Sequence, residues 1–145
     1  MAHAAPVPVG VNAAGLPDVF SARTHKIMHW ALPVTLGLIY GYWVAANNRA
    51  GGEITGWNIL LGFVSTVAFA VLWIAVRAVA SGLPRELHAV LWAAFSGCAF
   101  GFLYAQTGES IVRSVVMSLV VSASVFAVLF YRYYTHEDAE GHRIS

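Results

Sequence analysis

Four long apolar stretches, separated by short polar segments, dominate the chain. They cover roughly residues 28–47, 57–79, 86–106 and 110–134. An α-helix needs about 20 mostly apolar residues to cross the hydrocarbon layer of a bilayer, and each stretch has that length. The separators contain Gly, Asn, Ser and Pro, on which helices commonly end. The pattern therefore predicts an all-α membrane protein with four transmembrane helices.

The links between the stretches are short, so consecutive helices are expected to be antiparallel neighbours. The four spans would then form two hairpins within one transmembrane domain, residues 28–134. Residues 1–27 are expected to be an N-terminal tail, in which Pro17 and nearby apolar residues favour a short interfacial helix. Residues 135–145 are expected to be a polar C-terminal tail.

Composition supports the membrane assignment and excludes several classes of protein. Apolar residues make up 59% of the chain and charged residues only 10%, against about 25% charged residues in soluble domains. The net charge of +1 and the lack of a basic cluster exclude a nucleic-acid-binding surface. A single cysteine, Cys98, excludes an intramolecular disulfide framework. The lipid bilayer is therefore the first expected partner.

The distribution of basic residues predicts the orientation. Loops that carry more Lys and Arg are usually retained on the cytoplasmic side. Of the eight basic residues, only Arg49 and Arg113 fall on one side of the predicted spans. The others fall on the opposite side: Arg23, Lys26, Arg77, Arg85, Arg132 and Arg143. We therefore expect a multi-pass protein of the cell (cytoplasmic) membrane with both termini inside.

The two halves of the transmembrane domain resemble each other. The first and third stretches both contain Gly-x-x-aromatic-Gly-aromatic-x-x-Ala, and the second and fourth share six of ten positions. The matching segments are residues 37–45 with 97–105 and 64–73 with 121–130. Apolar helices use few residue types, so chance similarity is the alternative. The similarity predicts a parallel internal duplication of about residues 29–77 and 88–132.

Small residues recur every four positions and predict where helices pack. In the first and third stretches they are Gly37, Gly41, Ala45, Ala93, Gly97, Gly101 and Ala105. Such stripes allow close backbone approach, a main source of helix association in lipid. In the fourth stretch, Ser114, Ser118 and Ser122 have the same spacing. Their hydroxyls could hydrogen-bond between helices, or line a pore in an oligomer.

Histidines near one end of the spans are the candidate ligands. His25 and His29 are four residues apart at the start of the first span, and Glu86 and His88 open the third. Neutral imidazoles could bind a metal, haem b or a quinone, although hydrogen bonding at the membrane interface is the simpler role. The segment ending His29-Trp30 resembles the start of the first helix in b561-type membrane cytochromes. That resemblance implies one haem at most, because the second and fourth stretches contain no histidine.

The remaining features indicate no catalytic chemistry. No Asp, Glu, Lys, Arg or His side chain lies in the middle of a span, where such groups usually mark transporters and proton relays. Cys98 lies in mid-membrane, where a thiol behaves as a small apolar group. We therefore expect no enzyme and no obligatory cofactor, but a protein that forms a homo-oligomer or serves as a non-catalytic subunit of a larger membrane complex. A channel lined by the serines, or a haem- or quinone-associated electron-transfer subunit, are the alternatives.

Overall fold

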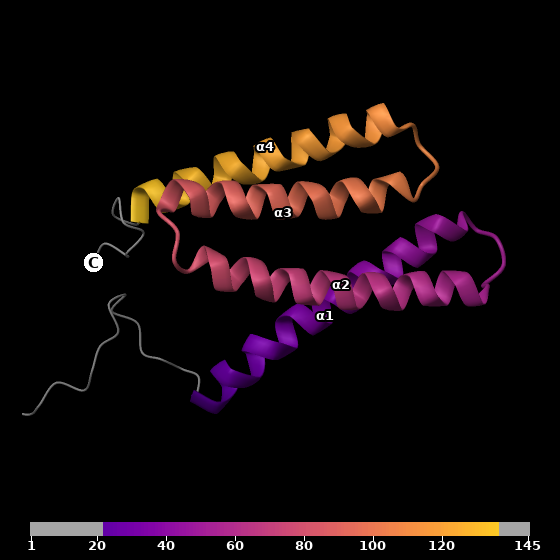
Figure 1. The fold of residues 1–145 in the computed structure, drawn as a ribbon, viewed down its shortest axis with the longest axis horizontal. Coiled ribbons are helices and arrows are strands. Elements are labelled where there is room, and N and C mark those ends of the chain that lie inside the picture. Colours follow the sequence, from indigo (N-terminus) through magenta and orange to yellow (C-terminus); the bar gives the residue numbers. More distant parts are fainter. Residues whose placement is uncertain (1–21, 137–145) are drawn as a thin grey trace, which may run out of the picture.

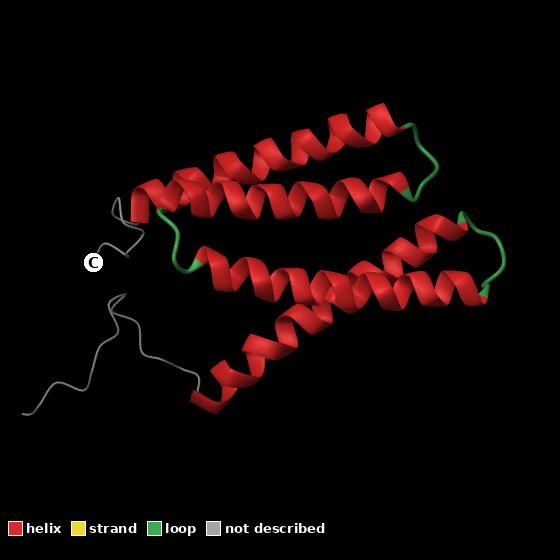
Figure 2. Ribbon diagram, in the orientation of Figure 1, coloured by secondary structure: helices red, strands yellow, loops and turns green. Residues whose placement is uncertain are grey.

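The computed structural model describes residues 22–136, and these residues form four α-helices. They are α1 (Ala22–Arg49), α2 (Gly56–Ala80), α3 (Arg85–Ala105) and α4 (Ile111–His136) (Figures 1 and 2). Each helix is long and apolar enough to cross a membrane. The predicted all-α architecture, with four helices long and apolar enough to span a membrane, is thus confirmed. The predicted interfacial helix around Pro17 and most of the predicted C-terminal tail lie outside the described residues.

The helices follow the predicted spans closely, with one difference at the start of α1. That helix begins at Ala22 rather than near residue 28, so it includes residues expected to belong to the tail. Its segment with membrane-spanning character is Lys26–Arg49. Polar residues can continue a helix beyond the hydrocarbon layer, so apolarity alone locates the span and not the first helical turn.

Local sequence explains where the first helix pair turns. Ala50 and Gly51 have positive φ angles of 49° and 82°, which end α1. A capping box then starts α2. In it, the Thr55 hydroxyl accepts a hydrogen bond from the Asn58 backbone N–H, and the Asn58 side chain accepts one from the Thr55 N–H. The turn and the cap bring α2 back along α1.

The helices associate as two tightly packed pairs, α1 with α2 and α3 with α4 (Figure 1). Fewer contacts join the pairs, and they are made by α3 with α1 and α2. Within the described residues, α4 contacts α3 alone. The four helices therefore form a bundle that is open along α4, and the two pairs meet through α3.

Candidate functional site

Glycines of α1 let the first pair approach at backbone distance. A Cβ placed on Gly41 would overlap the carbonyl oxygen of Gly62 and the hydroxyl of Thr66, both on α2. A Cβ on Gly37 would lie 2.8 Å from the Thr66 carbonyl oxygen. A Cβ on Gly62 would lie 3.2 Å from that of Ala45. The small residues noted in the first stretch thus lie against α2 and leave no room for larger side chains.

Serines of α4 face the small residues of α3. The Ser118 hydroxyl donates to the Gly97 carbonyl oxygen at 2.6 Å, and the Ser122 hydroxyl donates to that of Ala93 at 3.1 Å. A Cβ on Gly101 would lie 2.9 Å from the Ser118 hydroxyl oxygen. Ser114 is also buried, but its hydroxyl has no hydrogen-bond partner. Among the predicted small residues, Ala105 differs because it is exposed. In this chain the serine face is therefore used between helices.

The packing register of the two pairs differs from the sequence repeat. The repeat pairs Thr66 with Ala123 and Ser65 with Ser122. In the structure Thr66 packs on the glycines of α1, whereas Ser122 rather than Ala123 packs on Gly97. A shift of one residue rotates a helix face by about 100°. The duplication therefore remains a prediction, and it does not extend to identical helix contacts.

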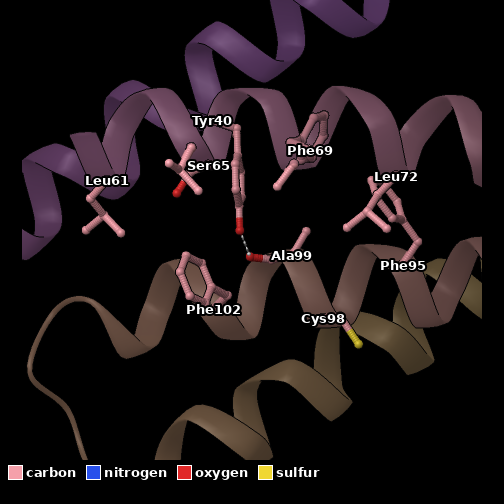
Figure 3. Close-up of a pocket in the computed structure, with 11 residues that line it drawn as sticks. Tyr40, Leu61, Ser65, Phe69, Leu72, Phe95, Cys98, Ala99 and Phe102 are labelled. Carbon is pink, nitrogen blue, oxygen red and sulfur yellow. Dashed lines mark hydrogen bonds between the residues drawn. The ribbon is translucent and has the colours of Figure 1, made fainter. Parts of the chain in front are cut away.

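A cavity of about 300 Å³ lies where the two pairs meet (Figure 3). Its walls are almost entirely apolar, and they come from α1, α2 and α3. The lining residues are Tyr40, Leu61, Val64, Ser65, Ala68, Phe69, Leu72, Phe95, Cys98, Ala99 and Phe102. Tyr40 extends across the junction, and its hydroxyl donates to the Ala99 carbonyl oxygen at 2.8 Å (Figure 3). The cavity offers an apolar recess but no pair of groups positioned for acid–base or nucleophilic chemistry.

An amide network joins the pairs beside the α1–α2 turn. The side-chain amide of Asn58 donates to the side-chain oxygen of Asn48 at 2.9 Å, and Asn48 donates to Gln106 at 3.1 Å. Asn47 donates to the Leu103 carbonyl oxygen at 3.4 Å. The sequence pattern predicts Asn47 and Asn48 only as the end of the first helix. Asn47 lies seven residues after Tyr40 on α1. This spacing places both side chains on the same face of the helix, and it was the sequence signal that could have predicted their position.

Aromatic rings fill the other part of the junction between α2 and α3. Ring centroids are 5.3 Å apart for Phe69 and Phe95 and 4.9 Å apart for Trp73 and Trp92. Tyr40 stacks on Phe69 at 4.7 Å. These separations are typical of favourable aromatic pairs. The amide network and the aromatic rings join the two helix pairs, although few direct helix contacts connect them.

The structure places the predicted histidine ligands in different surroundings. His29 is exposed and lines a second cleft with residues of α2. The ring of His88 packs on that of Tyr133 at 4.7 Å, and Glu86 is exposed. The side chain of His25 lies outside the described part. Among the described residues, no group of three or more His, Cys, Asp or Glu side chains could hold a metal ion.

Comparisons with protein-family models, with curated proteins and with solved structures each found no match.

Tyr40→Phe tests the junction between the pairs. Loss of the hydroxyl leaves the Ala99 carbonyl oxygen without this side-chain donor, and we expect a loss of about 0.6 kcal/mol in unfolding free energy, the mean for interhelical hydrogen bonds in membranes. Tyr42→Phe is the matched control because Tyr42 is exposed. Unfolding in detergent by added sodium dodecyl sulfate measures both. Equal stability of the two variants would show that the Tyr40 bond does not help to hold the pairs.

Proposed function

We propose that the protein is a non-catalytic integral membrane protein that acts by assembly, either as a homo-oligomer or as a subunit of a larger membrane complex. The single observation behind this proposal is the open edge of the bundle: within the described residues, α4 contacts α3 and no other helix. Residues Ala123, Ser124 and Ala127 of α4 are exposed. Small side chains spaced four apart allow a second helix to approach closely.

The exposed face of α4 has the same spacing of small residues as the face that packs against α3. Ser118 and Ser122 pack against α3 on one side of the helix, while Ala123 and Ala127 repeat the same four-residue spacing on another side. Contact with lipid would need no small residues there, since lipid tails accept large apolar side chains equally well. A helix of another subunit would gain from them. The first partner to test is a second copy of this chain, because it is available in every preparation.

The proposal includes a topology. The short links favour two antiparallel hairpins, and the basic residues favour both termini on the cytoplasmic side of the cell membrane. The described basic residues at the end where α1 begins are Arg23, Lys26, Arg77, Arg85 and Arg132. Accessibility of single cysteines at each helix end to a membrane-impermeant thiol reagent would test this orientation.

Disulfide trapping in native membranes tests assembly. Cys98 is the only cysteine, so Cys98→Ser gives a cysteine-free background. Ala127→Cys in that background is expected to yield a covalent dimer on mild oxidation, because disulfides form only at short Cα separations. Val71→Cys, on an exposed position of α2, is the matched control.

Native mass spectrometry of the unmodified protein, released in mild detergent, gives the subunit count independently. We expect an oligomer or a complex with another membrane protein. A bare monomer, together with no more dimer from Ala127→Cys than from Val71→Cys, would contradict the assembly role.

A further inference from the structure

A second cleft of about 300 Å³ lies between the start of α1 and the end of α2. Figure 1 shows the cause, since α1 crosses α2 and its N-terminal part runs away from it. The cleft is lined by His29, Trp73, Ile74, Arg77, Ala78 and Ser81. Polar groups and apolar groups thus share one recess at the ends of two membrane-spanning helices.

Arg77 is the charged group of this cleft, and it has no carboxylate partner among the described residues. The acidic residues within the described part of the chain are Glu53, Glu86 and Glu109, and none of them lines the cleft. The contrast with Arg113 is direct, because Arg113 forms an ion pair with Glu109 at 2.9 Å. The exposed Arg77 side chain lines the cleft, and its guanidinium can donate two parallel hydrogen bonds to a phosphate group.

We propose that this cleft binds the phosphate group of an anionic phospholipid. Arg77 supplies the charge, His29 supplies a ring N–H, and Ile74 with Trp73 contacts the apolar part of the lipid. The depth agrees, because Arg77 lies in the last turn of α2, at the level where a bilayer has its headgroups. Basic pockets between membrane helices are established lipid-headgroup sites in general.

Charge around the cleft favours an anion. Arg23 and Lys26, near the start of α1, lie at the same end of the helices as Arg77. The carbonyl groups at the end of α2 oppose an anion, but they amount to only about half an elementary charge. The full charge of Arg77 exceeds that opposition. A soluble anion such as inorganic phosphate has no apolar part, so it could not contact the apolar side chains of the cleft.

Native mass spectrometry of the full chain in detergent tests the proposal. The protein is titrated with phosphatidylglycerol, with phosphatidylcholine of the same acyl chains, or with inorganic phosphate. We expect one tightly retained phosphatidylglycerol per chain and weaker retention of phosphatidylcholine. Arg77→Gln should weaken phosphatidylglycerol binding about tenfold, as loss of one charge-assisted contact predicts. Arg77→Lys should restore part of the affinity, because it keeps the charge but loses the two parallel donors.

Arg113→Gln is the matched control, since it removes an exposed arginine at the opposite end of the helices. It should leave lipid binding unchanged. Helix content by circular dichroism should be the same for all variants, because Arg77 and Arg113 are both exposed. Unchanged phosphatidylglycerol binding by Arg77→Gln, or equal binding of phosphatidylcholine by the wild type, would overturn the site. Inorganic phosphate binding as tightly as phosphatidylglycerol would overturn its assignment to a lipid.

Discussion

Gly41→Ala is expected to destabilise the protein by about 2 kcal/mol, a typical cost of overpacking a tight contact. The new Cβ would overlap the Gly62 carbonyl oxygen, which belongs to the backbone of α2 and cannot rotate away. The helices must therefore separate, and neighbouring contacts between α1 and α2 weaken with them. Alanine also has a more favourable helix propensity than glycine, by about 1 kcal/mol. The measured loss of unfolding free energy is therefore smaller than the steric cost of the new Cβ. Unfolding by added sodium dodecyl sulfate, followed by tryptophan fluorescence, measures it.

Gly56→Ala is the matched control for this substitution. A Cβ on Gly56 would meet no atom within 4 Å, so the same chemical change occurs without a steric conflict. We expect its stability to stay within about 0.5 kcal/mol of the wild type, as for most surface changes. Gly41→Ile should be more damaging than Gly41→Ala. If Gly41→Ala were as stable as Gly56→Ala, the close contact between α1 and α2 would be disproved.

The helices themselves could be predicted because their signal is local and strong. Lipid requires about 20 consecutive apolar residues and internal hydrogen bonding of the backbone, which leaves few alternatives to a helix. The four-residue spacing of small residues is also visible in the sequence, and one of them, Gly41, lies against Gly62 in the structure. Both properties can be recognised within one segment of the chain.

The junction between the pairs could not be predicted in the same way. Tyr40 reaches a carbonyl group 59 residues later in the chain, and nothing near Tyr40 in the sequence specifies that partner. The second cleft depends on the angle at which α1 crosses α2, which is set by packing along the whole pair. The serines of α4 were predicted either to hydrogen-bond between helices or to line a pore. These two interpretations differ in what the hydroxyls face, and the spacing of the serines in the sequence does not specify it.

The contact between α3 and α4 differs from the α1–α2 contact in the atoms that a new Cβ would overlap. A Cβ on Gly97 would overlap the hydroxyl oxygen of Ser122, a side-chain atom, and would lie 2.9 Å from the carbonyl oxygen of Ser118. Gly97→Ala is therefore expected to cost about 2 kcal/mol of unfolding free energy. Ser122→Ala alone removes one interhelical hydrogen bond, to Ala93, at a cost of about 0.6 kcal/mol.

The double variant Gly97→Ala/Ser122→Ala should be more stable than Gly97→Ala alone, because the nearest obstructing atom is gone. We expect a coupling of about 1 kcal/mol in a double-mutant cycle, measured by the same detergent unfolding. At Gly41 the corresponding rescue by Thr66→Ala should be smaller, since the Gly62 carbonyl oxygen remains in place. Additive effects at Gly97 and Ser122 would show that these residues do not meet. Equal rescue at both glycines would show that side chains, and not the backbone, limit how closely α1 approaches α2.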